Sequence, residues 1–258
     1  MVLAVDIGNT NIVVGCFDDD GMRMIGRLAT DRAATELEYT VQLRNLLKLN
    51  GMTGLKAEGA IICSVVPAVT GNMKLALEPF VGENVMVVGP GLKTGLKINI
   101  DNPTALGADR VADAVAASQE YPLPLITVDM GTATTIGVVD ETRTFIGGMI
   151  VPGVMVSLNA LSGGTSQLPH IALEPPTKPI GRNTVDCMRS GIVYHNAAGV
   201  DGMIRRIEEQ LGRKCTVVVT GGLSAAIIPY CTHEMIYDPD LLLKGLMIIY
   251  RKNARKMK

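Results

Sequence analysis

The chain has 258 residues, of which 47% are hydrophobic and 19% are charged, a balance typical of a folded globular protein and not of a disordered one. Its 24 Lys and Arg residues nearly balance its 25 Asp and Glu residues, so no overall field attracts it to nucleic acid or to an anionic membrane. No apolar stretch reaches the roughly 18–20 residues of a membrane span. We therefore expect neither a nucleic-acid partner nor a membrane.

The five cysteines lie far apart in the sequence and form no C-x-x-C pair, which points to free thiols in a reducing cytoplasm. The first residues lack the basic start and the apolar core of a signal peptide, which also favours a cytoplasmic location. The one concentration of basic residues is typical of a solvated helix end. It consists of Arg251, Lys252, Arg255, Lys256 and Lys258.

The first part of the chain predicts the element order βββαβαβα. The expected strands are 2–5, 12–17, 22–28, 60–66 and 85–88, and the expected helices are 35–50, 68–80 and 107–120. Turn-forming residues at 8–9 and 18–21 separate the first three strands, which predicts an antiparallel meander. Thr35 and Glu38 form a capping-box signature at the start of the first helix. The apolar face that we expect for this helix consists of Leu37, Val41, Leu46 and Leu49.

The same order of elements begins again after residue 121. The expected strands are 125–129, 134–139, 143–150, 216–219 and 235–237, and the expected helices are 154–161, 184–211, 223–230 and 241–253. Residues 168–183 are rich in proline and predict an irregular excursion within this second part. The repetition predicts two domains of related fold, residues 1–121 and 122–258.

Two short turns with the same residue pattern are the strongest sign of duplication. Asp6-Ile7-Gly8-Asn9-Thr10 and Asp129-Met130-Gly131-Thr132-Ala133 each follow one apolar strand and precede another. Such turns bring backbone N–H groups and hydroxyls near a carboxylate, which suits phosphate together with a cation. A single D-x-G turn is usually a plain hairpin. Two matching copies in one chain favour a site that holds the phosphates of one nucleotide from both sides.

Motifs of other enzyme classes are absent from the sequence. There is no Gly-Lys dipeptide and hence no P-loop, and there is no G-x-G-x-x-G, H-E-x-x-H or G-x-S-x-G. His170, His195 and His233 are isolated from one another, which disfavours a zinc site or a histidine-centred triad.

A set of motifs, in this order, resembles the type III pantothenate kinase family of the actin-like ATPase superfamily. The motifs are Asp6-Ile7-Gly8-Asn9-Thr10, Gly107-Ala108-Asp109-Arg110, Asp129-Met130-Gly131-Thr132-Ala133-Thr134, Gly147-Gly148-x-Ile150-x-Pro152-Gly153 and Thr220-Gly221-Gly222. The resemblance covers nearly the whole chain, and Gly-Ala-Asp-Arg separates this family from other actin-like ATPases. It implies a duplicated ribonuclease-H-like α/β fold with a mixed five-stranded sheet in each half. It also implies a homodimer that transfers the γ-phosphoryl group of ATP to pantothenate, giving 4′-phosphopantothenate in the first step of coenzyme A biosynthesis.

The resemblance further implies roles for individual residues. The residues that would bind ATP are Asp6, Ile7, Gly8, Asn9, Thr10, Asn11, Ile12, Val13, Thr132, Gly221 and Gly222. Those that would contact pantothenate are Gly107, Ala108, Asp109, Arg110 and Thr184. Asp6 would lie near Mg²⁺, and Asp129 would ligate K⁺ or NH₄⁺. Asp109 would accept the proton of the attacking hydroxyl, and Arg110 would present its planar donor group to substrate oxygens.

Two positions depart from the family pattern. Ile100 precedes Asp101-Asn102-Pro103 where many members carry a tyrosine, so a hydroxyl contact to pantothenate is missing and substrate affinity is in question. His170 stands where many members carry an arginine, and we assign it no catalytic role.

Three alternatives stay open. Asp109 and Arg110 could instead form a salt bridge at the start of a helix, a structural role. The fold would equally suit a kinase for another small hydroxylated metabolite, such as a sugar, although Gly107–Arg110 argues against it. A non-enzymatic, ATP-binding regulatory accessory factor is the third alternative.

Overall fold

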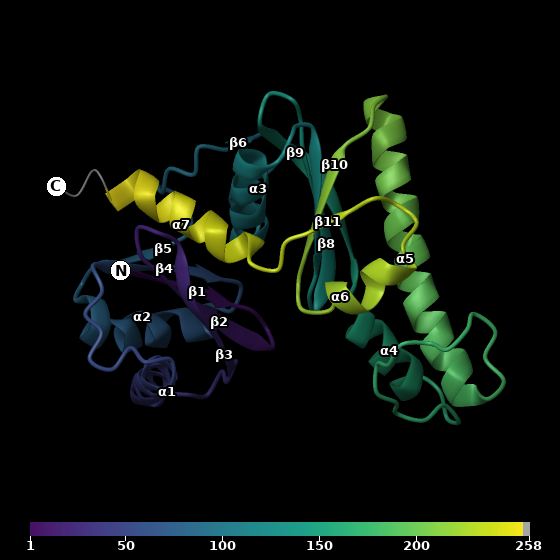
Figure 1. Cartoon of the computed structure of the whole chain (residues 1–258), viewed down its shortest axis with the longest axis horizontal. Helices are drawn as coiled ribbons and strands as arrows, with labels where there is room; N and C mark the ends of the chain where they lie inside the picture. Colours follow the sequence, from purple (N-terminus) through teal and green to yellow (C-terminus); the bar gives the residue numbers. More distant parts are fainter. Residues whose placement is uncertain (255–258) are drawn as a thin grey trace. The chain divides into compact units, whose positions relative to one another are not determined.

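The structure is a computed structural model that describes residues 1–254, and the chain in it divides into two compact units (Figure 1). The first unit contains residues 1–96, 101–116 and, of the described residues, 240–254. The second unit contains residues 97–100 and 117–239. The predicted domain boundary between residues 121 and 122 stays a prediction. Of the basic run, Arg251 and Lys252 are exposed in the last helix, and the residues from 255 onward, Arg255, Lys256 and Lys258 among them, lie outside the described part.

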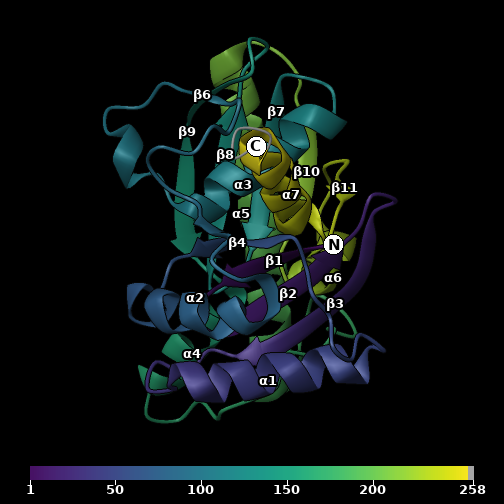
Figure 2. The same ribbon diagram turned by 90° about the vertical axis from the view of Figure 1, so that its left-hand side faces the viewer.

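The first unit is built on a five-stranded mixed sheet with the strand order β3-β2-β1-β4-β5. Its strands are β1 (Val2–Ile7), β2 (Asn11–Phe17), β3 (Met22–Ala29), β4 (Gly59–Ser64) and β5 (Val85–Val87). The first three strands form the predicted antiparallel meander, and β4 and β5 run parallel to β1. Helices α1 (Glu36–Leu49) and α2 (Pro67–Val81) lie on one side of this sheet, and α7 (Leu241–Ala254) contacts β1 and β4 from the other side (Figure 2).

Helix α1 begins as predicted but buries a different face. Thr35 and Glu38 form both bonds of the capping box, a device that typically stabilises a helix by about 1 kcal/mol. The expected apolar face was wrong, because Leu37 is 68% exposed, whereas Tyr39 is fully buried. The residues that face the core are Tyr39, Leu43 and Leu47, four residues apart. Burial of the tyrosine is tolerated because its hydroxyl bonds to backbone atoms of Asp31.

The second unit has one strand more than the five expected. Its sheet order is β11-β10-β7-β8-β9-β6. The strands are β6 (Lys97–Ile98), β7 (Leu125–Met130), β8 (Ala133–Val139), β9 (Thr144–Pro152), β10 (Thr216–Thr220) and β11 (Ile236–Tyr237). The additional strand, β6, pairs its two residues with Thr144 and Phe145 of β9. Apart from β6, the sheet repeats the pairing of the first unit, with an antiparallel meander followed by parallel strands.

The remaining elements match the expected pattern closely. Helices α4 (Val154–Gly163) and α5 (Thr184–Leu211) pack together over the core of the second unit, and α3 (Ala108–Glu120) begins in the first. Residues 168–183 form no helix or strand, as predicted. The predicted helix 223–230 is instead a short α6 (Ser224–Ile227) followed by a 3₁₀ turn. Pro229 explains the break, since it cannot donate a backbone hydrogen bond.

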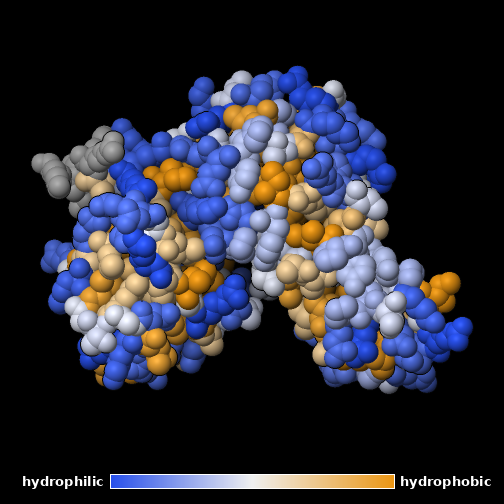
Figure 3. Space-filling view, viewed as in Figure 1, coloured by the Kyte–Doolittle hydropathy of each residue, from blue (hydrophilic) through white to orange (hydrophobic). Residues whose placement is uncertain are grey.

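The face of the molecule in view is mixed in hydropathy. Figure 3 shows small groups of hydrophobic residues interspersed among hydrophilic ones on the face in view. The five cysteines are free thiols, and Cys16 and Cys63 are buried. Among residues 1–254, no helix combines the length and the apolar character needed to cross a membrane.

Candidate active site

The first Asp-x-Gly turn is an exposed loop held by a rigid base. Ile7 and Ile12, which flank the turn, are fully buried, so they could contact a ligand only through their backbone atoms. The Gly8 N–H donates to the Asn11 carbonyl at 3.0 Å, and a Cβ on Gly8 would lie 3.1 Å from that oxygen. Asn9, Thr10 and Asn11 are exposed at the tip. The turn therefore presents polar groups to solvent from a fixed backbone.

The carboxylate of Asp6 lies beside a buried thiol. Asp6 and Cys63 are paired in the parallel register of β1 and β4, and their side chains are hydrogen bonded, with the thiol as the donor. Burial raises the pKa of Cys63 well above its ordinary value, and the carboxylates of Asp6, Asp109 and Asp113 raise it further. The charges of three carboxylates, two of them of predicted site residues, thus act on one thiol within the first unit. Among the described residues, no group of three or more His, Cys, Asp or Glu side chains is arranged to hold a metal ion, so Mg²⁺ at Asp6 would also need oxygen ligands from a bound phosphate group.

The Gly-Ala-Asp-Arg sequence forms the start of α3. Asp109 lies in the first turn of the helix, where the positive end of the helix dipole favours an anionic side chain. Its carboxylate accepts a hydrogen bond from the Arg110 backbone N–H at 2.8 Å, and a Cβ on Gly107 would clash with it. Burial lowers the pKa of the half-buried Arg110 guanidinium, and the charge of Asp109 opposes that effect. The hydrogen bond thus fixes the Asp109 carboxylate at the start of the helix, and its charge acts on the guanidinium of the next residue.

In the second unit, the other Asp-x-Gly turn is enclosed by glycine-rich segments. The Gly131 N–H donates to the Ala133 carbonyl at 3.0 Å, and the Gly153 N–H donates to the Thr132 carbonyl at 3.2 Å. Gly221, with φ of 98°, lies so close to Asp129 that any Cβ there would clash with the carboxylate. Asp129 and Gly221 thus lie close together, and their roles toward a cation and ATP stay predictions, as does that of Thr132. The carboxylate and the surrounding carbonyls are oxygen ligands of the kind that a monovalent cation could use.

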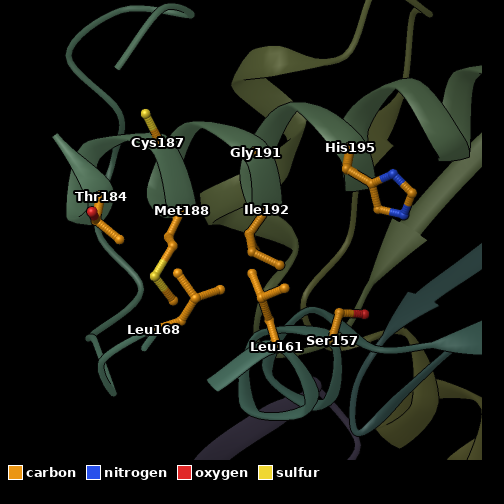
Figure 4. Close-up of a pocket in the computed structure, with 9 residues that line it drawn as sticks. All are labelled: Ser157, Leu161, Leu168, Thr184, Cys187, Met188, Gly191, Ile192 and His195. Atoms are coloured by element: carbon orange, nitrogen blue, oxygen red, sulfur yellow. The ribbon is translucent and has the colours of Figure 1, made fainter. Parts of the chain in front are cut away.

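Thr184 lies elsewhere in the second unit, at the first position of α5. Asn183 caps this helix by accepting a hydrogen bond from the Asp186 N–H at 2.9 Å. Thr184 opens onto an apolar groove of about 490 Å³ between α4 and α5. In Figure 4, Thr184 and Cys187 lie at one end, Ser157 and His195 at the other. Between them lie Leu161, Leu168, Met188 and Ile192. The role of Thr184 toward pantothenate stays a prediction.

Sequence reasoning missed three features of the first unit. Asp113 follows Asp109 by one helical turn on α3, so helical spacing was a signal that could have found it. Cys63 lies inside an apolar strand, and only the strand register shows that it neighbours Asp6. Thr30 and Arg32 touch the first turn through hydrogen bonds to Gly8 and Asn9. No local sequence pattern predicts such a long-range contact.

Two related sheets, each with an Asp-x-Gly turn after its central strand, define the actin-like ATPase fold. Component A of (R)-2-hydroxyglutaryl-CoA dehydratase from Acidaminococcus fermentans superimposes with a TM-score of 0.56 at 15% identity, covering 100% of this chain and 99% of that chain. An archaeal actin homolog superimposes with a TM-score of 0.52 at 12% identity, covering 100% of this chain and 99% of that chain. These likenesses show the fold alone, and the predicted fold class is confirmed.

The sequence comparisons define the family. The family described as type III pantothenate kinase matches residues 2–206. A type III pantothenate kinase of Exiguobacterium sibiricum is 42% identical over 253 residues, which cover 98% of this chain and 100% of the relative. Another, of Bacillus cytotoxicus, is 40% identical over 254 residues, covering 98% of this chain and 97% of the relative. The chain belongs to the type III pantothenate kinase family, which confirms the predictions of the family and of a kinase.

Proposed function

We propose that this chain is an ATP-dependent pantothenate kinase that transfers the γ-phosphoryl group of ATP to pantothenate and forms 4′-phosphopantothenate, the first step of coenzyme A biosynthesis. The observation that carries the proposal is the placement of both motifs in the first unit, where Asp6 pairs with Cys63 across β1 and β4 and the charge of Asp109 also acts on that thiol. It joins the phosphate turn to the Gly-Ala-Asp-Arg sequence within one unit. Family membership supports the choice of pantothenate as the acceptor.

In this mechanism, phosphoryl transfer needs positioning and charge compensation more than covalent chemistry. The turn from Asp6 to Val13 would hold the phosphates of ATP, with Ile7 and Ile12 contributing backbone atoms because their side chains are buried. Mg²⁺ beside Asp6 would compensate the charge of the phosphates. Asp109 would take the proton of the attacking hydroxyl, and Arg110 would orient pantothenate through its oxygens.

The second unit would contribute the remaining nucleotide contacts. Thr132 would bind the phosphate chain from the second turn, and Gly221 and Gly222 would lie along the nucleotide where a side chain would collide with it. Asp129 would hold K⁺ or NH₄⁺ and so add positive charge near the phosphates. The closeness of Gly221 to Asp129 supports one continuous binding surface on this unit.

We infer a cytoplasmic homodimer in which a second copy covers the groove between α4 and α5. The groove is lined almost wholly by apolar atoms, and Val156 beside it is 42% exposed. A soluble protein gains stability by covering such a surface. Sedimentation equilibrium should report a dimer, and Leu161→Glu should shift it to monomer, because Leu161 lines the groove and is 37% exposed, so its replacement would bury a charge in the interface.

A coupled assay with ATP, Mg²⁺ and K⁺ tests the function by comparing pantothenate with several sugars. ADP should form with pantothenate and not with the sugars. Turnover of a sugar instead would establish a kinase for another hydroxylated metabolite. Tight ATP binding without turnover of any acceptor would favour the regulatory accessory factor. The assay therefore separates the three functions by their acceptor dependence.

A further inference from the structure

The segment that follows β3, residues 30–34, folds back onto the first Asp-x-Gly turn, and we call it the strap. Thr30 makes the contact with two hydrogen bonds. Its hydroxyl donates to the Gly8 carbonyl at 2.7 Å, and its backbone N–H donates to the Thr10 carbonyl at 3.1 Å. The strap is therefore fastened to both sides of the turn by its first residue.

The rest of the strap is fixed by the core. The fully buried Tyr39 donates its hydroxyl proton to the Asp31 carbonyl at 2.6 Å and accepts from the Asp31 N–H at 3.1 Å. The Asn72 side chain donates to the Ala34 carbonyl at 2.9 Å. The Ala33 N–H is bonded to the Asp31 carboxylate at 2.9 Å. The backbone on both sides of Arg32 is thus anchored, and the position of Arg32 is set by the fold.

Arg32 extends from the strap to the tip of the turn. One of its terminal nitrogens, Nη2, donates to the Asn9 side-chain oxygen at 3.0 Å. Arg32 is exposed, and within residues 1–254 that bond is the one contact that engages its guanidinium. A guanidinium has five N–H donors in a planar fork, so most of them stay available beside the turn.

We propose that Arg32 binds the phosphate chain of the nucleotide, with Asn9 as the residue that aims it. The inference rests on the proposed function, because it takes the turn from Asp6 to Asn11 as the phosphate site. An arginine fork matches the spacing of phosphate oxygens and forms charge-assisted hydrogen bonds with them. Asn9 needs no phosphate contact of its own in this arrangement. It holds the guanidinium at the turn before the nucleotide arrives, which lowers the entropic cost of binding.

The test is the dissociation constant of MgATP, measured by calorimetry without pantothenate. Arg32→Gln should weaken MgATP binding about 5- to 20-fold, the loss expected for exposed, charge-assisted bonds. The dissociation constant of Arg32→Lys should lie between those of the wild type and Arg32→Gln, because lysine keeps the charge but lacks the planar set of donors. Arg44→Gln is the matched control, since it removes the same charge from an exposed position of α1 with no bond to the turn. It should change the constant less than twofold.

A double-mutant cycle tests the role given to Asn9. Asn9→Ala should weaken MgATP binding in the wild type but have little further effect in the Arg32→Gln background. Independent, additive losses would show that Asn9 does not act through Arg32 and would overturn that part of the proposal. Thermal melts of the variants should match the wild type, because Thr30 and Tyr39 hold the strap without Arg32.

The outcomes separate the inference from the function on which it rests. Wild-type affinity in Arg32→Gln, with pantothenate turnover intact in the wild type, would overturn the role of Arg32 and leave the proposed function standing. Equal losses of MgATP affinity in Arg32→Gln and Arg44→Gln would also overturn the role of Arg32, because they would show a general effect of charge. Failure of the wild type itself to bind MgATP would remove the proposed function and the inference together.

Discussion

Asp109 combines a helix-start position with a place in the carboxylate cluster, and the two roles have different consequences. We predict that Asp109→Asn lowers kcat by about 10²–10⁴, because asparagine has nearly the same shape but cannot accept a proton. The melting temperature should change little. Steady-state kinetics measure kcat and thermal melts measure stability, so together they distinguish a proton acceptor from a structural helix cap. A variant that melts several degrees lower but keeps a near-normal kcat would make Asp109 a structural cap, with Asp101 the nearest candidate for the base.

The Cys63 thiol should be inert in the native protein. Burial and three nearby carboxylates raise its pKa, so it stays protonated well above neutral pH, and only the thiolate is a strong nucleophile. Iodoacetamide at about pH 8 should leave Cys63 unlabelled in the native protein and label it once the chain is unfolded. Mass spectrometry of the digested protein measures the labelling of Cys63 in both states. Rapid labelling of Cys63 without loss of structure would contradict the placement of Asp6 beside it.

At the scale of elements, the end of α5 is fastened by a buried carboxylate. Glu208 is 5% exposed and accepts hydrogen bonds from Lys214 Nζ at 2.7 Å and from the Cys215 N–H at 3.1 Å. Burial opposes the ionised form, but these bonds and the nearby His233 outweigh it and lower the pKa of Glu208. The carboxylate therefore stabilises the fold at neutral pH.

We predict that Glu208→Gln lowers the melting temperature at pH 7, and that the difference from the wild type shrinks in acid. Because the pKa of Glu208 is lower in the native state than in the unfolded chain, its ionised form stabilises the native state at any pH above the unfolded-state pKa. That stabilisation is lost as the pH falls through the native-state pKa. Melts from about pH 7 to pH 3 would show the convergence. The exposed neighbour Glu209→Gln serves as the control and should follow the wild type at every pH. A constant difference across the range would rule out ionisation of Glu208 as the cause.

Most elements could be predicted from the sequence because their signals are local. The Thr35 capping box and the turn at residues 18–21 specify their own geometry. The features that the sequence did not predict correctly depend on residues that are distant in sequence. Strand β6 has two residues and exists through pairing with β9, and the buried face of α1 is chosen by Tyr39 and its bonds to Asp31.

At the scale of the whole molecule, duplication was visible in the sequence because a repeated turn is a repeated string of residues. These strings contain Asp6 and Asp129, and the separate Gly-Ala-Asp-Arg motif contains Asp109, so all three were candidate site residues. What the strings could not supply is the set of residues that reach the site from other elements, such as Cys63 and Arg32. Those contacts arise from strand register and from the strap, and neither leaves a local pattern.

The second turn predicts a dependence on monovalent cations. Asp129→Ala should raise the K⁺ requirement or abolish turnover, because a carboxylate ligand of the cation is lost and the triphosphate charge is less well compensated. The exposed Glu141→Ala removes a carboxylate from the β8–β9 turn of the same unit and should keep wild-type kinetics. Titration of activity with K⁺ compares the two. Full activity of Asp129→Ala in buffer free of K⁺ and NH₄⁺ would remove this role from Asp129.

The central claim is that both turns and the Gly-Ala-Asp-Arg sequence serve one transfer from ATP to pantothenate. The most direct measurement is detection of the product by mass spectrometry after incubation with ATP, Mg²⁺, K⁺ and pantothenate. We predict that 4′-phosphopantothenate forms in equal amount to ADP, and that Asp109→Asn, still folded, forms it far more slowly. ATP bound by the wild type without any phosphorylated pantothenate, or with a phosphorylated sugar in its place, would contradict the claim.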